Sequence, residues 1–311
     1  MPHDDEQFSL LSSKPRRPVT QRWLAHLWQE WTVSSWRPIS PACAKPRPET
    51  WPNDRLTTAW LGHSTVLMNF FGVTVLTDPV LLSRIGIPLP FTAIGPKRLT
   101  RAALKIAELP PIDLILLSHA HFDHLDWRTL RRFDRGPQVV TAPRTCGLLR
   151  WTRLRDITEL RWGETYEIRT AAGSLLVRAI PVNHWGARLR KDSYRGYNAY
   201  VLERNGRRVI FAGDTAFTND FAKRCDAHPY DLAIFGIGAY DPWIRSHCTP
   251  EQAIAMASAA GARFIMPVHH QTFKLSVEPL REPIERFVRR MADEPERIAL
   301  REIGGTFMLP N

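Results

Sequence analysis

The sequence predicts one α/β domain with mixed sheets, preceded by an N-terminal arm. Three observations lead to this fold class. Short apolar runs of strand length recur from residue 57 onward, helix-like stretches stand between several of the later runs, and the first 55 residues lack the strand-length runs. Early strands followed by alternating strands and helices are typical of layered α/β domains. A chain of 311 residues is long enough to bury the core of such a domain.

The arm is predicted to cover residues 1–55, and the domain residues 56–311. Prolines recur in the arm, and between them Thr20 can cap a helix. An apolar stripe with helical spacing follows, formed by Trp23, Leu24, Leu27, Trp28 and Trp31. Tryptophans flanked by arginines are typical of a helix at a membrane surface. The same stripe would also fit against the domain or a second copy of the chain in a homodimer, and both interpretations stay open.

The elements of the domain follow in order. Strands are predicted at TTAWL, STVLMNF, VTVLT, IDLILLS, QVVTA, SLLVRAIP, YNAYVLE, RRVIFAG, DLAIF and RFIMPV. One helix is predicted to begin after Thr249, with Pro250 in its first turn and Gln252 three residues after the cap. A second helix is predicted over residues 277–294, VEPLREPIERFVRRMADE.

Charge and cysteine content restrict the partners and the compartment. The net charge is +11 and the pI about 9.9, which favours anionic partners such as phospholipid surfaces, nucleic acid or phosphorylated substrates. Four cysteines without CxxC spacing do not form a disulfide framework, so a cytoplasmic location is expected. The chain has no apolar run of about 18 residues and no signal-peptide pattern at its N-terminus.

Imidazole and carboxylate side chains gather where the strand IDLILLS ends. His119, His121, Asp123 and His124 form the motif HxHxDH within six residues. In an extended segment His119 and His121 point to the same side, because side chains repeat every two residues. A turn near Asp123 would let the last two side chains face a neighbouring point.

Three later strands end in residues of the same kind. His184 follows SLLVRAIP, Asp214 follows RRVIFAG, and His269 and His270 follow RFIMPV. A single histidine after a strand is usually a structural residue, but four such clusters together predict a metal site. Imidazole and carboxylate are the ligands of borderline divalent ions, zinc above all, with manganese or iron as alternatives.

The motifs, in this order, resemble the metallo-β-lactamase superfamily. Within it, WLGHST, LTDP, GPKR, ELPPID, HAHFDHLD, NHW, FAGDT and VHHQTF are similar to the N-acyl-phosphatidylethanolamine-hydrolysing phospholipase D family. The ascorbate-6-phosphate lactonase branch shares a subset of them. The resemblance covers about residues 57 to 280, and it implies an αββα sandwich with a dinuclear metal site at one edge.

The resemblance also implies a role for each motif residue. His119, His121 and His184 would bind the first ion, Asp123, His124 and His269 the second, and Asp214 would bridge both. A hydroxide shared by the two ions would be the nucleophile, since two cations lower the pKa of a shared water. Asp123 is therefore expected to be needed for both metal and turnover. His247, beside the helix cap, would bind the phosphate or protonate the leaving group; its alternative role is that of a surface capping residue.

Several residues near these motifs have two interpretations. His63 in WLGHST matches a family histidine near the site and would support a ligand or contact substrate. Asp126 is either an acceptor for a ligating imidazole or a helix-start acid, whereas Asp78 is expected to fix a loop. Cys248 is expected to be a packing residue. His270 stands where the family often has tryptophan, and Ser246 where the animal enzyme has glutamine; both changes fall on the predicted pocket wall.

Two stretches bear on the substrate. The apolar residues 80–98 would line a groove for acyl chains or fold onto the core. Beyond His184, a basic loop carries Arg188, Arg190, Lys191 and Arg195, which would bind an anionic headgroup or remain solvated.

The sequence therefore predicts a metal-dependent phosphodiesterase that cleaves N-acyl-phosphatidylethanolamine-type phospholipids and makes peripheral contact with a membrane. Its partner would be a phospholipid or another anionic small molecule. The alternatives are a lactonase or small phosphoester hydrolase, and a non-catalytic metal-binding protein at a membrane surface. Nucleic acid is not expected, because no inserted RNA-binding domain accompanies the charge. A redox di-iron role is disfavoured because position 121 is histidine, whereas that branch resembles HxExDH.

Overall fold

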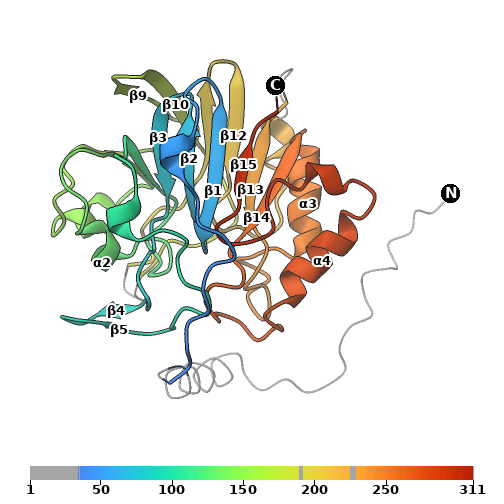
Figure 1. Ribbon diagram of the computed structural model, residues 1–311, viewed down its shortest axis with the longest axis horizontal. Helices are drawn as coiled ribbons and strands as arrows, with labels where there is room; N and C mark the ends of the chain where they lie inside the picture. Colours follow the sequence, from blue (N-terminus) through green and yellow to red (C-terminus); the bar gives the residue numbers. More distant parts are fainter. Residues whose placement is uncertain (1–33, 35, 189–191, 225–228, 311) are drawn as a thin grey trace.

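Two β-sheets lie face to face, and helices cover their outer sides (Figure 1). The computed structural model describes residue 34 and residues 36–188, 192–224 and 229–310. The predicted arm helix lies outside these residues, as do Arg190 and Lys191. The predicted α/β class is confirmed, because both sheets mix parallel and antiparallel strands. None of the described helices has the length and apolarity that crossing a bilayer requires.

The first sheet has seven strands in the order β15-β1-β2-β3-β6-β7-β8. Their bounds are Leu56–Gly62 for β1, Thr65–Phe70 for β2, Val73–Thr77 for β3, Leu114–Leu117 for β6, Gln138–Thr141 for β7, Ile157–Glu159 for β8 and Thr306–Met308 for β15. Strands β1 to β3 form an antiparallel meander, and β3, β6, β7 and β8 run parallel. The carboxyl ends of these parallel strands therefore meet at one edge of the sheet.

The second sheet has six strands in the order β14-β13-β12-β11-β10-β9. Their bounds are Thr165–Thr170 for β9, Gly173–Ile180 for β10, Ala199–Arg204 for β11, Arg207–Phe211 for β12, Leu232–Gly236 for β13 and Phe264–Val268 for β14. Strands β9 to β12 are antiparallel, whereas β12, β13 and β14 are parallel. This sheet also brings the ends of its parallel strands to one edge.

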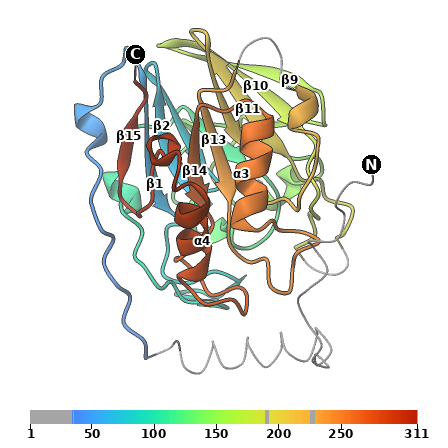
Figure 2. The same ribbon diagram turned by 90° about the vertical axis from the view of Figure 1, so that its right-hand side faces the viewer.

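Three α-helices are found in the described residues: α2 (Trp127–Leu130), α3 (Pro250–Ala259) and α4 (Glu282–Arg290). Helices α3 and α4 pack on the outer side of the second sheet (Figure 2). Short 3-10 helices cover Pro48–Thr50, Ile106–Glu108, Cys146–Leu149, Ala222–Arg224 and Pro295–Arg297. The predicted cap of α3 is confirmed: Thr249 accepts a hydrogen bond from the Gln252 amide, and the Gln252 side chain accepts one from the Thr249 amide.

Helix α4 is shorter than the predicted 277–294. Its first residue is Glu282, because Glu278 instead accepts hydrogen bonds from the backbone amides of Ala239 and Asp241, which ties the preceding segment to the loop after β13. Pro279 cannot donate a backbone hydrogen bond within a helix. The helix therefore begins only where Pro283 can occupy its first turn.

Alternating side chains of the second sheet serve two apolar cores. On β12, Val209 and Phe211 join the cluster between the sheets, whereas Ile210 joins the cluster under α3 and α4. Strand β13 shows the same alternation, with Ile234 facing the first sheet and Phe235 facing the helices. A period of two is what an extended strand covered on both faces requires. The central runs of β12 and β13 are continuously apolar for this reason.

Candidate metal centre

The residues of the HxHxDH motif and the later strand ends meet at the edge where the parallel strands finish. Strand β6 leads into Ser118 and His119, β12 leads to Asp214, and β14 leads to His269. His184 joins them from the segment between β10 and β11. Each of the seven residues predicted as metal ligands lies in one of two adjoining clusters: His119, His121, Asp123, His124, His184, Asp214 and His269.

The first cluster consists of His119, His121, His184 and Asp214, whose ligand atoms all lie within 4.8 Å of one another. His121 Nδ1 is 2.9 Å from His119 Nε2 and 3.3 Å from His184 Nε2. Asp214 Oδ2 lies 3.9 Å from Nε2 of both His119 and His184. Three ring nitrogens and one carboxylate oxygen thus face a common point.

The second cluster contains Asp123, His124 and His269, and Asp214 lies against it as well. Asp214 Oδ2 is 3.0 Å from His124 Nε2 and 3.3 Å from His269 Nε2. Asp123 Oδ2 is 3.5 Å from His124 Nε2 and 3.4 Å from His269 Nε2. Because Asp214 approaches the ligand atoms of both clusters, its carboxylate stands between them.

The donor sets fit divalent ions. A tetrahedral zinc site with bonds of about 2.0–2.1 Å holds its ligand atoms about 3.3–3.4 Å apart, and the separations in both clusters scatter around that value. Within the described residues, His124 Nε2, His269 Nε2 and both Asp214 carboxylate oxygens are buried without a hydrogen-bond partner. Such atoms cost about 1–3 kcal/mol each when nothing satisfies them. A cation between them would satisfy several at once.

Electrostatics hold both carboxylates and the imidazoles of His119 and His121 in the forms that bind metal. Against the effect of burial, the nearby carboxylates instead raise the pKa of His124, and that of His269 to about 9, so these two rings would release a proton when a cation binds. Burial opposes ionisation of Asp214, but the charges of His124 and His269 outweigh it and hold the pKa of Asp214 well below its usual range. The pKa of Asp123 is likewise low, since the charge of His124 overcomes the effect of burial. Burial and the neighbouring imidazoles lower the pKa of His119 and His121, which keeps these rings neutral. Ionised carboxylates and neutral imidazoles are what a metal site requires.

Outside the ligands, Asp78 is the acceptor that orients His124. Its Oδ2 accepts a hydrogen bond from His124 Nδ1 at 2.7 Å and from Ser118 Oγ at 2.5 Å, and its Oδ1 accepts from the Ser118 amide at 2.7 Å. The prediction that Asp78 only fixes a loop was therefore incomplete. Of the two roles that the sequence predicts for Asp126, the structure shows the helix-start acid, because its carboxylate caps α2 by accepting from the amides of Arg128 and Thr129.

His63 supports a ligand rather than contacting substrate. Its Nε2 is 2.9 Å from Asp123 Oδ2, and its side chain is 2% exposed, so no substrate can reach the ring. One ring nitrogen of His63 lies within 4.8 Å of the ligand atoms of Asp123, His124 and His269, so it belongs to the same group of donor atoms. His63, Asp78 and His269 all adopt positive φ, at 54°, 32° and 61°. Such backbone strain at non-glycine residues gathers at functional sites.

Arg188, predicted to bind a headgroup or remain solvated, and His270, predicted on the pocket wall, both make contacts within the fold. Arg188 donates from Nε to the Ala120 carbonyl at 2.9 Å and from a guanidinium nitrogen to the Leu125 carbonyl, so its donors hold the HxHxDH segment from behind. Its guanidinium also lies over the Phe122 ring. The His270 ring is buried against Trp60, with ring centroids 4.6 Å apart, and it does not line the pocket over the clusters.

A pocket of about 340 Å³ opens directly over the two clusters. His121, Asp123 and Asp214 form its polar floor, and His247 stands on its wall with Nδ1 3.8 Å from Asp214 Oδ2. The remaining lining residues are Trp185, Ala239, Trp243, Ser246 and Leu275. Ser246 also accepts a hydrogen bond from His184 Nδ1 through its carbonyl, at 2.7 Å. The sequence does not predict either tryptophan as a pocket residue. Only Trp185 has a local indication, because it directly follows the motif residue His184.

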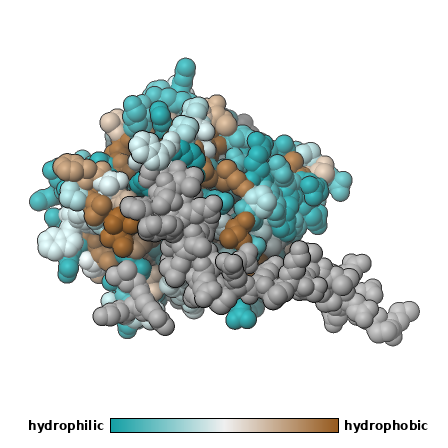
Figure 3. Space-filling view, turned by 90° about the horizontal axis from the view of Figure 1, so that it is seen from below, coloured by the Kyte–Doolittle hydropathy of each residue, from teal (hydrophilic) through white to brown (hydrophobic). Residues whose placement is uncertain are grey.

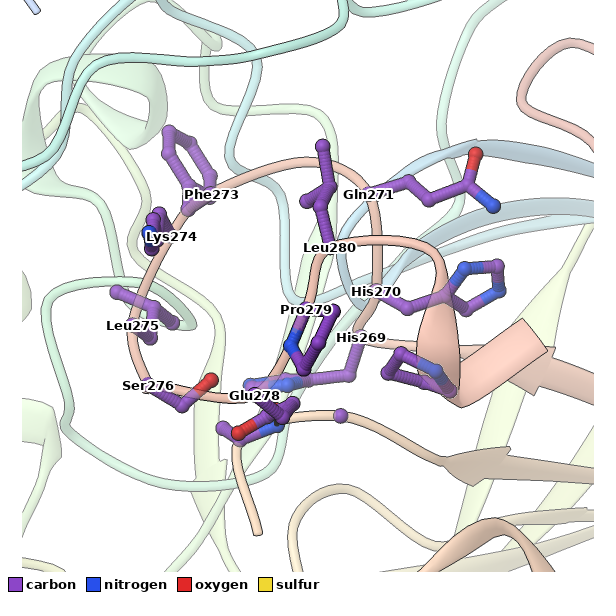
Figure 4. Close-up of a pocket in the computed structure, with 13 residues that line it drawn as sticks. His269, His270, Gln271, Phe273, Lys274, Leu275, Ser276, Glu278, Pro279 and Leu280 are labelled. Carbon is purple, nitrogen blue, oxygen red and sulfur yellow. Dashed lines mark hydrogen bonds between the residues drawn. The ribbon is translucent and has the colours of Figure 1, made fainter. Parts of the chain in front are cut away.

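The loop after β14 forms another side of the site. Figure 4 shows it arching from His269 past Phe273 and Leu275 to Leu280 around a second, smaller pocket. Phe273 packs with Val80 and Ile85, and Leu275 packs against the same group. No residue of the apolar stretch 80–98 lines the pocket over the clusters, so the predicted acyl groove is not found there.

The sandwich and its paired histidine–aspartate clusters together define a metal-dependent hydrolase. The chain belongs to the beta-lactamase superfamily: the model of the family described as beta-lactamase superfamily domain matches residues 74–270. This confirms the resemblance found in the sequence motifs.

Relatives and solved structures agree with this assignment. An uncharacterised protein of Mycobacterium tuberculosis is 33% identical over 277 residues, which are 86% of this chain and 72% of that protein. The protein named N-acyl-phosphatidylethanolamine-hydrolyzing phospholipase D 1 of Caenorhabditis elegans is 32% identical over 253 residues, covering 76% of this chain and 70% of its own length. The structure of a metallo hydrolase from Ignicoccus hospitalis superposes with a TM-score of 0.63 at 18% identity, over 82% of this chain and 99% of that chain, which shows the shared fold.

Proposed function

We propose that the protein is a dinuclear phosphodiesterase that hydrolyses N-acyl-phosphatidylethanolamine-type phospholipids. The observation that carries the proposal is the pair of ligand clusters sharing Asp214 at the floor of an apolar-walled pocket. Two cation sites beside each other suit a phosphodiester, since one ion can stabilise the attacking oxygen and the other the leaving oxygen of the displacement. The names of the nematode relative and of a yeast relative, 30% identical over 73% of this chain, support the same substrate class.

The two clusters would each hold one divalent ion, zinc first. His119, His121 and His184 would hold one ion, Asp123, His124 and His269 the other, with Asp214 between them. When bound, such ions lower the pKa of a shared water and stabilise negative charge on the phosphate. In the net reaction a water oxygen bonds to phosphorus, the bond from phosphorus to the ethanolamine oxygen breaks, and that oxygen takes up a proton. The products would be phosphatidic acid and an N-acylethanolamine.

The residues of this chain shape that reaction from the pocket wall. His247 lies over the clusters with a side chain 14% exposed, so it can reach a phosphoryl oxygen or the leaving oxygen. Trp185, Trp243 and Leu275 present apolar surface beside the polar floor. Apolar walls next to a few convergent polar groups are typical of sites for amphipathic small molecules. The pocket therefore suits a charged headgroup joined to hydrocarbon.

The test measures phosphatidic acid released from N-acyl-phosphatidylethanolamine dispersed in detergent, using the full chain loaded with zinc. Wild type should release it. Asp123→Asn should lose bound metal and at least about 100-fold of the rate, whereas His247→Ala should keep its metal and lose about 100-fold of the rate. Asp134→Asn replaces an exposed aspartate outside the clusters and should behave as wild type.

The outcomes separate the chemistry from the substrate. No phosphatidic acid from wild type with metal bound would reject the phospholipid assignment and direct the search to lactones and small phosphoesters. Wild-type rates in Asp123→Asn would reject the ligand assignment itself.

A further inference from the structure

We infer that the hairpin β4–β5 and four arginines beside it form a docking site for an anionic phospholipid surface. The hairpin consists of β4 (Ile87–Pro88) and β5 (Ala93–Ile94), paired antiparallel. It projects from the first sheet next to α2 (Figure 1). This inference rests on the proposed function, because it specifies the surface on which the lipid substrate would be met.

The tip of the hairpin is apolar and exposed. Phe91 is 96% exposed and Ile87 53% exposed, and Leu89 and Ile94 are also open to solvent. Hydrophobic atoms gather in the left part of the lower face of the molecule (Figure 3), on the side where Figure 1 places the hairpin. An exposed group of large apolar side chains on one projecting turn marks an interaction site rather than ordinary surface.

Four arginines stand directly beside this tip. A depression of about 480 Å³ is lined by Leu89, Pro90, Phe91, Arg128, Arg131, Arg132 and Arg153. One guanidinium nitrogen of Arg128 donates to the Phe91 carbonyl at 3.1 Å, which connects the tip to the first turn of α2. Arg131, Arg132 and Arg153 are exposed, and within the described residues no carboxylate forms an ion pair with any of the four. A concave, strongly positive surface of this kind attracts anionic groups.

The combination favours a lipid surface over other polyanions. A nucleic acid would use the arginines but would leave Phe91 and Ile87 in water. A bilayer with anionic headgroups suits both the apolar tip and the arginines, since the tip can enter the headgroup region while the guanidinium groups bind phosphate. Charge complementarity and exposed apolar area thus select the same partner.

A chain of packed apolar side chains leads from the docking site to the pocket over the metal clusters. Ile85, at the base of the hairpin, packs with Val80 and Phe273, and Leu275 packs against this group. Leu275 in turn lines the pocket over the metal clusters. Seating the hairpin tip in a bilayer would therefore hold the pocket close to the same lipid surface.

The experiment measures co-sedimentation of the full, zinc-loaded chain with vesicles of phosphatidylcholine alone or of phosphatidylcholine with phosphatidylglycerol. Wild type should bind the anionic vesicles and bind the neutral ones far less. The pair Arg131→Gln/Arg132→Gln should weaken binding about 30-fold, because each arginine near an anionic surface contributes a factor of about five. Phe91→Ala should weaken it about tenfold, from lost insertion of the ring.

The control pair Arg289→Gln/Arg290→Gln removes the same charge from two adjacent exposed arginines at the end of α4. It should bind anionic vesicles nearly as well as wild type. Equal losses in both double variants would overturn the inference, because net charge alone would then explain binding. Tight binding of a polynucleotide together with no binding of anionic vesicles would also overturn it.

Activity separates this inference from the proposed function. The Arg131→Gln/Arg132→Gln and Phe91→Ala variants should hydrolyse detergent-dispersed substrate at the wild-type rate and lose rate only on anionic vesicles. Hairpin-dependent vesicle binding without any hydrolysis by wild type would leave the docking site standing and reject the phospholipase assignment. Hydrolysis by wild type, together with vesicle binding that neither variant weakens, would support the phospholipase assignment and reject the docking site.

Discussion

Replacing Asp78 by asparagine tests whether the metal centre depends on the acceptor behind His124. Asp78 accepts three hydrogen bonds at 2.5–2.7 Å, two from Ser118 and one from His124 Nδ1, and its side chain is fully buried. An asparagine in the same place has only one acceptor oxygen. Whichever way its amide is turned, at least one of these three donors then faces an NH₂ group, and His124 Nδ1 no longer faces a charged carboxylate.

The magnitude follows from the loss of that acceptor. Removing an outer acceptor from a ligating histidine costs about 10–100-fold in metal affinity, or about 1.4–2.7 kcal/mol. A buried donor left without a partner costs a similar amount of folding stability, about 1–3 kcal/mol. We therefore expect Asp78→Asn to bind zinc about 10–100-fold more weakly and to unfold at a lower urea concentration.

The assay is competition for zinc against a chromophoric chelator, with urea unfolding followed by circular dichroism. Asp113→Asn is the matched control, because Asp113 precedes the opposite end of β6 and accepts from the Thr74 amide at 2.7 Å, far from the clusters. Asp113→Asn should lose stability but keep its zinc affinity. Zinc affinities that are equal for Asp78→Asn and wild type would refute the reasoning.

Three further predictions concern the surroundings of the site. Gly213 has φ +59°, and an added Cβ would lie 2.7 Å from the Ser118 Cβ, so Gly213→Ala should displace Asp214 and lower zinc affinity. Gly206→Ala, at φ +71° in open space, should cost only about 1 kcal/mol of stability and leave zinc affinity unchanged. Equal zinc affinities of the two variants would contradict this prediction. Burial raises the pKa of Cys248 to about 12, so it is no thiolate nucleophile and Cys248→Ala should keep full turnover in the phosphatidic acid assay. Burial opposes ionisation of Glu159, but its hydrogen bonds, including those from the Arg144, Thr145 and Cys146 amides, lower its pKa below the ordinary 4.5. Its stabilisation is thus present above pH 4.5 and lost as the pH falls below it. Because the carboxylate is partly exposed and solvent screens it, urea unfolding should show Glu159→Gln only about 0.5–1 kcal/mol less stable at neutral pH, and closer to wild type in acid.

Local patterns in the sequence predicted the fold and the residues of the clusters because those features are local or repeat regularly. The HxHxDH spacing lies within one strand end, and the cap of α3 lies within four residues. Pairings between distant segments were not predictable. Asp78 reaches His124 only because β3 and β6 run parallel side by side, and nothing near Asp78 distinguishes it from Asp126.

The differences between predicted and observed contacts at other residues have the same cause. Arg188 reads as a solvated or substrate-binding cation, yet its partners are carbonyls more than 60 residues away in the sequence. The apolar stretch 80–98 reads as one unit, but the structure divides it into a buried base at Val80 and Ile85 and an exposed tip at Phe91. Which apolar residues are covered depends on the loop after β14, whose position no local pattern gives.

The shared position of Asp214 has a consequence for the whole chain. Each cluster takes ligands from both sheets: His119, His121, Asp123 and His124 follow β6 of the first, while His184, Asp214 and His269 belong to segments of the second. Bound ions would therefore cross-link the segments of the two sheets at their shared edge. Occupancy by an ion at 1,000 times its dissociation constant adds about 4 kcal/mol to the free energy of unfolding. Removing the ions with a chelator should therefore lower the free energy of unfolding and weaken the contact between the two sheets, as well as stop the reaction.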